Sequence, residues 1–530
     1  MAAMNLPPIV RHFARAVGGG DPAAELAAAL ACAATQAGHV CADLDTEVGW
    51  GPWVAQMDAD SRAAFRARLS GLAGVGGDAD WTPLVWDGRR LYLRRYRDYE
   101  RRVAEDLRRR AAHCRPLNAV AEARLAARFA DAGQRAAART ALERGLCLVS
   151  GGPGTGKTHT LARIIASLRE GDAVLRLGLA APTGKAAARM AEALAAAGVA
   201  LPAGGATTLH RLLGLRADGS CRRDRARPLA LDVLAVDEAS MIDLALMARL
   251  LDALPVGARL ILLGDRDQLA AVEAGAAFAD LCQSAALASC VAPLTTAFRF
   301  GGAIGALAAA LRTGDAATAI DLLRRADGSE LAWRPAGDMR ALIAAARAGY
   351  APFLDAVAEA RPPECLFERF AAFRVLCARR QEVEAVNRAL SGAESIVPGL
   401  PVMVTKNDPL LGVFNGDIGL ALPDPADGQL SACFLREDGV RRIAFARLPA
   451  WEAAWAMTVH KSQGSEFAQV LLVLPDESSP LLTRELVYTG ITRARSGAAL
   501  WAGEAALRAA IVRRAGRMSG LRESLDYRPC

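Results

Sequence analysis

The sequence feature that most constrains the fold is a glycine-rich loop that starts at Gly151. Four residues separate Gly151 from Gly156, Lys157 and Thr158, which is the spacing of a P-loop. An apolar run at 146–149 precedes the loop, and a helical pattern of apolar residues follows it. In such a loop, backbone N–H groups and a helix N-terminus face phosphate oxygens. We therefore predict a nucleotide site in an α/β domain, with the threonine hydroxyl holding Mg²⁺. A glycine-rich turn without a ligand is the alternative.

Composition limits the class of protein. At 530 residues the chain is long enough for about three or four domains. No apolar run reaches the roughly 18 residues that a membrane span requires, and the N-terminus lacks the pattern of a signal peptide, so we expect a cytoplasmic protein. The 11 cysteines show no metal-ligand spacing, and we expect reduced thiols without zinc or an iron–sulfur cluster. The net charge of +7 permits a nucleic-acid partner without requiring one.

The lysines are the more specific signal in the charge pattern. Only four of the 64 basic residues are lysine, namely Lys157, Lys185, Lys406 and Lys461. A compact ammonium and a guanidinium fork are not interchangeable at a phosphate, and each lysine lies in a stretch that other features single out. This coincidence favours a functional role for all four side chains.

Residues 1–110 carry no recognisable catalytic motif, and the first 80 or so are predicted to be helical. From position 91 onward, Tyr92, Tyr96 and Tyr99 recur at helical spacing opposite an arginine-rich face. Three interpretations of this helix stay open. In the first, the arginines form a solvated face and the tyrosine stripe packs on the core. In the second, the arginines bind DNA phosphates, and in the third, the helix is a docking surface for another subunit.

Two adjacent carboxylates follow the strand predicted at 231–236. At the end of a buried strand, Asp237 is placed to hold Mg²⁺ through a water opposite Thr158, while Glu238 is placed to polarise the attacking water. A surface acidic pair is the alternative, which the wholly apolar strand disfavours.

Two other predicted strands, 173–181 and 259–263, also end in polar residues. Thr183 and Lys185 follow the first, and Gln268 follows the second. Because ligands bind at the carboxyl edge of parallel sheets, we expect these side chains at the same edge as the glycine loop. The carboxamide of Gln268 is placed to sense a γ-phosphate or to orient water.

A second α/β pattern lacks a phosphate loop of its own. It includes predicted strands at 373–378 and 470–474 and a predicted helix at 482–495. Short β-rich runs with Asn-Gly and Gly-Asp turns interrupt it and predict a small β-barrel insert. The predicted domains are a helical N-terminal domain (1–110), a first RecA-like domain (111–290), a second RecA-like domain in two parts (291–395 and 451–530) and an SH3-like β insert (396–450).

In order and spacing, the motifs from Gln134 to Arg495 resemble those of superfamily 1 helicases, and within them the RecD-like group that moves 5′ to 3′ on DNA. The stretches 412–419, 458–466 and 91–96 resemble most closely the members that serve as the alpha subunit of exodeoxyribonuclease V. The resemblance implies two RecA-like domains that close on ATP and Mg²⁺ and so move single-stranded DNA.

The resemblance also implies partners. These are RecB-type and RecC-type subunits in a heterotrimer that acts on single-stranded and double-stranded DNA ends, with the N-terminal region packed against the RecC-type subunit. We find no nuclease motif in the sequence and expect any nuclease activity in another subunit. A stand-alone RecD-like repair helicase is the closest alternative, and a non-motor ATP switch or DNA-binding scaffold is another.

The resemblance assigns roles to individual residues. Catalytic roles fall to Lys157, Asp237, Glu238, Gln268, Arg299 and Arg493, with both arginines reaching the γ-phosphate from the second domain. Gln134 is implied to recognise adenine, and the phosphates are implied to contact Gly151, Gly152, Pro153, Gly154, Thr155, Gly156, Lys157, Thr158 and His159. Mg²⁺ is assigned to Thr158 and Asp237. DNA contacts are assigned to Thr183, Lys185, His210, Lys406, Asn415, Thr458, His460 and Lys461.

Overall fold

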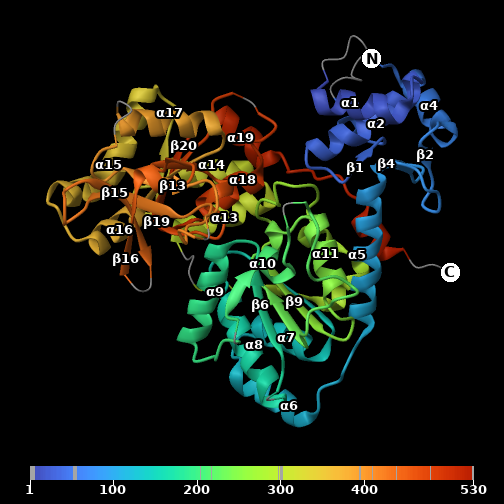
Figure 1. The fold of residues 1–530 in the computed structure, drawn as a ribbon, viewed down its shortest axis with the longest axis horizontal. Coiled ribbons are helices and arrows are strands. Elements are labelled where there is room, and N and C mark those ends of the chain that lie inside the picture. The colour runs from blue at the N-terminus through green and yellow to red at the C-terminus, as the bar shows by residue number, and fades with distance from the viewer. Residues whose placement is uncertain are drawn as a thin grey trace. The chain divides into compact units, whose positions relative to one another are not determined.

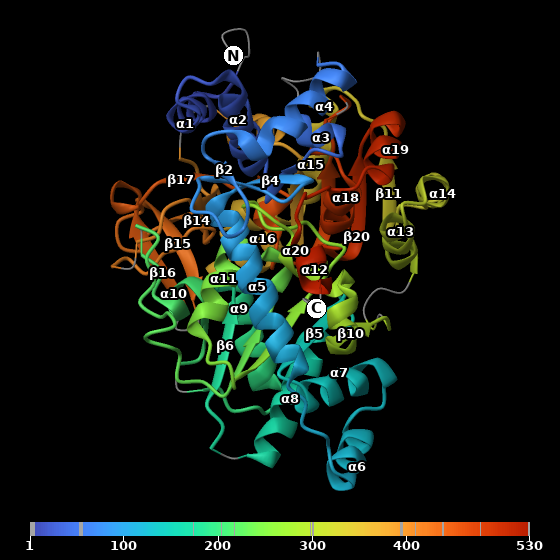
Figure 2. The same cartoon turned by 90° about the vertical axis from the view of Figure 1, so that its right-hand side faces the viewer.

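The structure is a computed structural model, and it contains two compact units, each built on its own parallel sheet (Figures 1 and 2). The first unit comprises residues 1–298 and 516–530, and the second comprises residues 299–515. The structure describes residues 6–51, 57–172, 174–202, 204–216, 218–296, 298, 302–392, 396–408, 410–436, 439–477 and 479–527.

The sheet of the first unit has six strands, all parallel, in the order β10-β5-β9-β8-β6-β7. The central strands are buried throughout, as expected when helices cover both faces of a parallel sheet. The strands are β5 (Leu146–Gly151), β6 (Leu177–Ala181), β7 (Ala206–Thr208), β8 (Val233–Val236), β9 (Arg259–Gly264) and β10 (Val291–Leu294). The helices are α6 (Ala119–Arg128), α7 (Ala132–Glu143), α8 (Lys157–Gly171), α9 (Gly184–Ala196), α10 (Leu209–Leu213), α11 (Leu244–Ala253) and α12 (Ala277–Gln283).

The strands predicted around the glycine loop are confirmed, and the sheet also includes β10. This strand starts at Val291, one residue beyond the predicted end of the first domain, and pairs with β5. A four-residue edge strand is too short to show a period of two in the sequence. Its pairing with β5 is what defines β10 as a strand.

The N-terminal part of the first unit has a small sheet in addition to the expected helices. Its strand order is β1-β4-β3-β2, and the strands are two to four residues long, too short for a visible period in the sequence. The strands are β1 (Cys41–Asp43), β2 (Val75–Gly76), β3 (Leu84–Trp86) and β4 (Arg90–Leu93). The helices are α1 (Pro8–Gly18), α2 (Pro22–Gln36), α3 (Glu47–Trp50) and α4 (Ala59–Arg68).

Helix α5 (Arg94–Ala112) carries the tyrosine stripe. Tyr92 precedes the helix, in strand β4, and is fully buried, while Tyr96 and Tyr99 pack against the core of the first unit. Arginines of the same helix form ion pairs within the chain; Arg102, for example, pairs with Asp252 at 2.7 Å, and its guanidinium lies 5.1 Å from the ring centroid of Tyr99. The stripe therefore packs on the core of its own unit, as the first interpretation predicts, and docking to another subunit stays a prediction.

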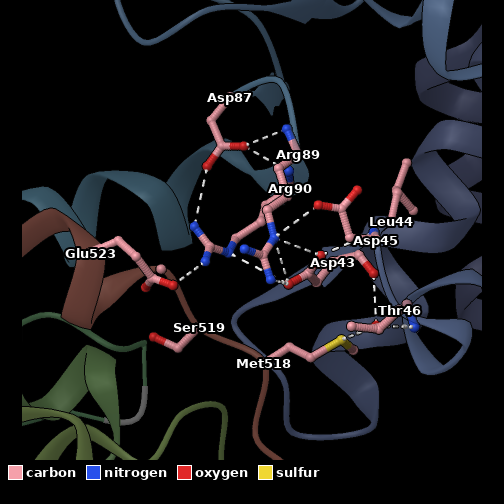
Figure 3. Close-up of polar contacts among 12 residues, drawn as sticks. Asp43, Leu44, Asp45, Thr46, Asp87, Arg89, Arg90, Met518, Ser519 and Glu523 are labelled. Carbon is pink, nitrogen blue, oxygen red and sulfur yellow. Dashed lines mark hydrogen bonds and ion pairs between the residues drawn. The ribbon is translucent and has the colours of Figure 1, made fainter. Parts of the chain in front are cut away.

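The C-terminal segment 516–527, called here the C-terminal strap, groups with the first unit, although the sequence pattern places it in the second domain. Val40 N donates to Met518 O at 2.8 Å, and Met518 N donates to His39 Nδ1 at 3.0 Å. Figure 3 shows Glu523 of the strap beside Arg90 of β4, with which it forms an ion pair. These contacts join residues that lie more than 400 positions apart, so no local sequence pattern predicts them.

The sheet of the second unit has five parallel strands in the order β11-β20-β19-β12-β18. The predicted strands at 373–378 and 470–474 are confirmed as β12 and β19. The strands are β11 (Leu331–Arg334), β12 (Phe373–Cys377), β18 (Ala456–Thr458), β19 (Phe467–Val473) and β20 (Ala494–Trp501). The helices are α13 (Gly302–Thr313), α14 (Ala316–Arg324), α15 (Met339–Ala358), α16 (Pro363–Ala372), α17 (Arg380–Ser391), α18 (Arg484–Ile491) and α19 (Glu504–Val512).

An antiparallel sheet of five strands, in the order β16-β15-β14-β13-β17, interrupts the second unit. It accounts for the predicted β insert, and its SH3-like character stays a prediction. Its strands are β13 (Pro401–Val404), β14 (Ile418–Pro423), β15 (Leu430–Arg436), β16 (Gly439–Ala444) and β17 (Trp451–Ala453).

Among the described residues, α15 is the one helix that is long and apolar enough to cross a membrane. Its Tyr350 and Phe353 are buried, and their rings pack against Phe370 and Trp455. Such aromatic packing within a unit is typical of the core helix of a globular domain.

Candidate active site

The glycine loop joins β5 to α8 and has the conformation that its sequence predicts. Gly154 and Gly156 both have a φ of 76°, in the left-handed region that favours glycine. A Cβ atom at Gly156 would lie 3.2 Å from Nε2 of Gln134 and 3.7 Å from the ring of Phe298. Both side chains therefore lie against the glycine turn, on the side where a Cβ atom would point.

Lys157, the first residue of α8, directs its ammonium group back toward the loop. Its Nζ donates to O of Gly151 at 2.6 Å and to O of Gly152 at 3.1 Å. The Thr155 hydroxyl also donates to Gly152 O, at 2.8 Å, which fixes the loop from inside. An ammonium group, a helix N-terminus and a glycine-rich backbone are thus gathered at one point, and together they suit an anion such as a phosphate.

Asp237 follows β8 and is buried beside the loop. Its Oδ2 accepts a hydrogen bond from the Thr158 hydroxyl at 3.3 Å, and its Oδ1 accepts from Glu238 N at 2.8 Å. Burial, with the charge of Glu238 adding to it, raises the pKa of Asp237 to about 6, although Lys157 opposes this. The carboxylate and the hydroxyl are the oxygen ligands that Mg²⁺ prefers.

The backbone of Glu238 is strained. Its φ of 54° lies in the left-handed region, where a residue with a Cβ costs about 1–2 kcal/mol. Sparsely populated backbone conformations cluster at functional sites, and this one turns the chain directly after the Asp237 carboxylate.

A second carboxylate, which the sequence reading missed, lies at the end of the neighbouring strand β9. Asp265 is 2% exposed, and its Oδ2 accepts from Nε2 of Gln268 at 3.0 Å. Burial raises the pKa of Asp265, and the charge of Lys157 lowers it. The signal was available in the sequence, because Asp265 directly follows an apolar strand, as Asp237 does. The orientation of the predicted Gln268 thus depends on this carboxylate.

The opposite side of the loop holds Gln134 and Phe298. Gln134 lies in α7 and is 5% exposed; its N donates to the capping Asp131 at 2.8 Å. Phe298 is 62% exposed, and its N donates to Gly154 O at 3.0 Å. Sequence reasoning named Phe298 only as the neighbour of Arg299, which lies outside the described residues. An exposed ring beside a buried carboxamide is a surface on which an aromatic base can stack.

Three predicted DNA-binding residues follow the ends of β6 and β7 in the same sheet. Thr183 caps α9, where its Oγ1 accepts from Ala186 N at 3.2 Å. Lys185 is half-buried in the first turn of that helix, and His210 is exposed in α10. All three therefore lie toward the sheet edge that carries the glycine loop, because the strands are parallel.

The remaining predicted residues form separate groups in the second unit. Thr458 ends β18 and accepts from Lys461 N at 3.3 Å, and the Lys461 ammonium pairs with Glu452 at 2.6 Å. His460 lies between them, in the 3-10 helix η6 (His460–Ser462). Lys406 and Asn415 are exposed in the β insert, between β13 and β14.

Arg493 is 3% exposed and lies between α18 and β20. The predicted helix therefore ends at Ile491 rather than at position 495, because parallel pairing with β19 takes over at Ala494. The Arg493 guanidinium donates to O of Thr489 at 3.3 Å and to O of Ser465 at 3.2 Å. Two carbonyl groups thus hold the charge in one orientation.

One predicted phosphate-site residue, His159, has a lowered pKa. It lies in the first turn of α8, where burial and the nearby charge of Arg163 lower its pKa. A neutral imidazole is therefore its usual form near neutral pH, and it adds no fixed charge to the loop.

Three protein families match parts of the chain. The AAA domain matches residues 134–274, and the UvrD-like helicase C-terminal domain matches residues 453–501. The N-terminal domain of RecBCD enzyme subunit RecD matches residues 3–92.

Similarity to curated proteins extends over nearly the whole chain. RecBCD enzyme subunit RecD of Mycobacterium tuberculosis is 39% identical over 556 residues, which cover 98% of this chain and 94% of that protein. The ATP-dependent RecD2 DNA helicase of Deinococcus radiodurans is 35% identical over 368 residues, or 66% of this chain and 46% of that protein. Among solved structures, Pif1 helicase from Candida albicans is similar over 72% of this chain and 96% of that chain, with 19% identity and a TM-score of 0.43.

Proposed function

Because this chain belongs to the RecD family of RecBCD enzyme subunits, we propose that it is an ATP-driven motor that moves 5′ to 3′ along single-stranded DNA. The observation that carries the proposal is the cluster of Lys157, Thr158 and Asp237 around one glycine loop. The AAA-domain match contains that cluster, and the match of residues 453–501 to the UvrD-like helicase C-terminal domain supports DNA as the track.

ATP is the proposed substrate. The ammonium group of Lys157 and the N–H groups of the loop bind its phosphates, because both are fixed there before any ligand arrives. The Gln134 carboxamide binds the edge of the adenine, and Phe298 offers its exposed ring to the face of the base.

The residues also fit Mg²⁺. The hydroxyl of Thr158 and the carboxylate of Asp237 lie 3.3 Å apart and are the proposed ligands. When bound, the ion supplies charge that neutralises phosphate oxygens. The raised pKa of Asp237 supports this role. Burial disfavours the ionised carboxylate, and a bound cation would compensate that negative charge.

Hydrolysis requires an oriented water and a positive charge at the γ-phosphate. Glu238, fixed by its left-handed backbone, takes the role of orienting and polarising the water, and Gln268 senses the γ-phosphate. Arg493, held by its two carbonyl partners, and Arg299 supply the charge from the second unit as arginine fingers.

The DNA strand is proposed to contact the residues already described at the strand ends and in the β insert. Lysine and histidine bind phosphates without sequence preference. These contacts are proposed for Thr183, Lys185, His210, Lys406, Asn415, Thr458, His460 and Lys461.

RecB-type and RecC-type subunits are the proposed partners in a heterotrimer that acts on DNA ends. The match of residues 3–92 to a domain named for the RecBCD subunit supports this assembly. We assign nuclease activity to another subunit. A stand-alone helicase is the second candidate, favoured by the similarity to the RecD2 helicase. The mass of the native protein and its co-purification with two large subunits separate these possibilities.

The test of the motor function is DNA-stimulated ATP hydrolysis together with strand displacement by the isolated chain. We expect unwinding of a duplex with a 5′ overhang and none of a duplex with only a 3′ overhang. Absence of DNA stimulation rejects the motor, whereas efficient unwinding from the 3′ overhang rejects the polarity alone.

A further inference from the structure

The loop between β9 and α12, residues 265–276 and called here the Gln268 loop, is tied to the end of helix α2 by one arginine of the C-terminal strap. Nη2 of Arg517 donates to O of Ala271 at 3.0 Å, and its Nη1 donates to O of Ala37, directly after α2, at 3.2 Å. Ala271 is 7% exposed and lies three residues after Gln268. One guanidinium therefore joins two segments of the first unit that are distant in sequence.

The place of this guanidinium is specific. Gly38 has a φ of 84°, and a Cβ atom there would lie 1.2 Å from Nη1 of Arg517, so the residue beside the guanidinium has to be glycine. Burial lowers the pKa of Arg517. Among the residues that the structure describes, its partners are the two carbonyl groups and no carboxylate. A charge buried without an opposite charge costs stability, so these bonds favour a positioning role over a stabilising one.

Further contacts fix the Gln268 loop on both sides of Ala271. Nε2 of Gln268 donates to Oδ2 of Asp265 at 3.0 Å, and Gly275 N donates to O of Gly38 at 3.0 Å, next to the arginine. The loop contains no helix or strand of its own. Segments without regular structure are mobile unless such contacts hold them, so the backbone position of the Gln268 loop depends on these bonds.

The strap that carries Arg517 is itself fixed on the first unit by contacts farther along the chain. Figure 3 shows Glu523 of the strap beside Arg90 of β4, and Gly520 N donates to the buried carboxylate of Glu100 at 2.9 Å. These contacts stay in place when the guanidinium is removed. A substitution at Arg517 therefore tests the guanidinium and not the attachment of the whole strap.

We propose that Arg517 is a positioning residue for ATP hydrolysis, which holds the Gln268 loop so that the Gln268 carboxamide meets the γ-phosphate. The inference rests on the proposed role of Gln268 and deepens it. A group that acts on a reacting phosphate has to be held within about 0.5 Å of its productive position, and a supporting contact supplies that precision. The N-terminal domain thereby contributes to the ATP site, although none of the candidate ATP-site residues lies within residues 1–110.

The first test measures DNA-stimulated ATP hydrolysis by the full-length chain. Arg517→Met keeps a long side chain and removes both hydrogen bonds, so we expect the turnover number to fall about 5- to 20-fold. The affinity for ADP, which lacks a γ-phosphate, should stay within about twofold of the wild type. Arg517→Lys retains a charged donor and should recover part of the lost turnover, although an ammonium group does not reproduce the guanidinium fork.

Glu523→Gln is the matched control. It breaks the ion pair with Arg90 in the same strap and leaves the contact between Arg517 and Ala271 in place. Turnover should therefore stay within about twofold of the wild type, since the effect of this pair is confined to the strap. Equal losses in Glu523→Gln and Arg517→Met would show that any loosening of the strap has the same effect, and would overturn the role of Arg517.

A double substitution shows whether Arg517 acts through Gln268. Gln268→Ala removes the carboxamide, and the addition of Arg517→Met should then lower turnover by less than about a further twofold, because the group to be positioned is already absent. If the two effects multiply, Arg517 acts independently of Gln268 and the proposal is overturned.

Hydrogen exchange of the nucleotide-free protein tests the same contact without any reaction. In Arg517→Met, amide exchange in the Gln268 loop should be about threefold faster or more, while exchange in the glycine loop at 151–156 should not change. Wild-type exchange rates in the Gln268 loop of this variant would show that Arg517 does not hold it, and would refute the proposal.

The outcomes separate this inference from the proposed function. If the wild type hydrolyses ATP with DNA stimulation and Arg517→Met does so equally well, the positioning role is refuted and the motor stands. If the wild type hydrolyses no ATP, both are refuted. A fall in ADP affinity that matches the fall in turnover would show a general loss of folded protein, and would refute the positioning role alone.

Discussion

The two parallel sheets of this protein place buried charge in different positions. In the first sheet, Asp237 and Asp265 lie at the carboxyl ends of their strands, within the electrostatic reach of Lys157. In the second sheet, the buried guanidinium of Arg374 lies near the start of β12, and its Nη1 donates to Ala454 O at 2.8 Å. Its central carbon lies 4.0 Å from the ring centroid of Phe370.

The difference teaches how to tell a site from a scaffold. The two carboxylates lie near the glycine loop, where a cation is expected to bind. Their burial raises their pKa values, which is typical of groups that act on a ligand. The Arg374 charge is enclosed by aromatic rings of its own unit, including that of Phe467 at 5.1 Å, and its role is structural. Similar parallel sheets thus carry nucleotide chemistry at one strand end and packing at the other.

The largest expected effect tests the first sheet. Lys157→Ala removes the ammonium group that two loop carbonyls position, and the ATP turnover number should fall by about 10²- to 10⁴-fold. The melting temperature should stay unchanged, because the side chain belongs to no core. Steady-state ATPase assays with and without DNA give the result, and wild-type turnover would reject the P-loop assignment.

Arg493→Ala tests whether the second sheet contributes a charge to the same reaction. If Arg493 contacts the γ-phosphate in the reacting state, turnover should fall by roughly 10- to 1,000-fold while ATP affinity stays within about threefold. Nucleotide binding is measured by fluorescence titration beside the ATPase assay. A loss of affinity with turnover preserved would show a uniform binding role instead. Arg299→Ala should behave in the same way.

Arg374 gives a pair of substitutions with opposite outcomes. Arg374→Ala leaves a cavity between Phe370 and Phe467, and the second unit should lose about 2–4 kcal/mol of unfolding free energy. Arg374→Met fills the space without a buried charge, so stability should change by less than about 1 kcal/mol or rise. Urea denaturation followed by near-UV circular dichroism distinguishes them. Equal destabilisation by both would show that the charge itself stabilises the unit.

Asp237→Asn should make the fold more stable and inactive. The folded pKa of about 6 lies above the ordinary value of 3.8, so the fold disfavours the charged form. The loss of unfolding free energy that burial of the Asp237 carboxylate causes is absent below pH about 4. It grows between pH 4 and 6 and reaches its full size above pH 6. At pH 7.5 we expect a gain on the order of 1–3 kcal/mol, with none at pH 4. Thermal unfolding at the two pH values measures it, and destabilisation at pH 7.5 would contradict the raised pKa.

The same titration predicts how Mg²⁺-dependent nucleotide binding varies with pH. Affinity should weaken as the pH falls through about 6, because protonated Asp237 cannot serve as a metal ligand. The Asn variant should lack this dependence, and isothermal titration at pH 5.5 and 7.5 compares the two proteins.

The smallest expected effect concerns Lys461, which pairs with Glu452 at a half-exposed position. Lys461→Ala should weaken single-stranded DNA binding about two- to fivefold and reduce its salt dependence by about one phosphate contact. Glu452→Gln frees the ammonium group and should strengthen binding. ATP affinity should not change in either variant. Fluorescence anisotropy over a range of salt concentrations tests this, and an unchanged salt slope would remove Lys461 from the DNA contacts.

The sequence alone determined the features that depend on neighbouring residues. The turn at Gly156 and the lysine at the start of α8 follow from local spacing, because a strand, a glycine loop and a helix N-terminus together define a phosphate site. The apolar strands that end at Asp237 and near Gln268 were equally readable. Their parallel alignment at one edge followed from the rule that crossovers bring carboxyl ends together.

Only the tertiary structure decided which side chains meet across long separations. Asp265 orients Gln268 and Phe298 flanks the glycine loop, and the C-terminal strap returns to His39 on the first unit. The tyrosine stripe turned out to face the core for the same reason. An amphipathic pattern states that a face is buried, but what buries it is fixed by contacts between segments that are distant in sequence, such as Arg90 and Glu523.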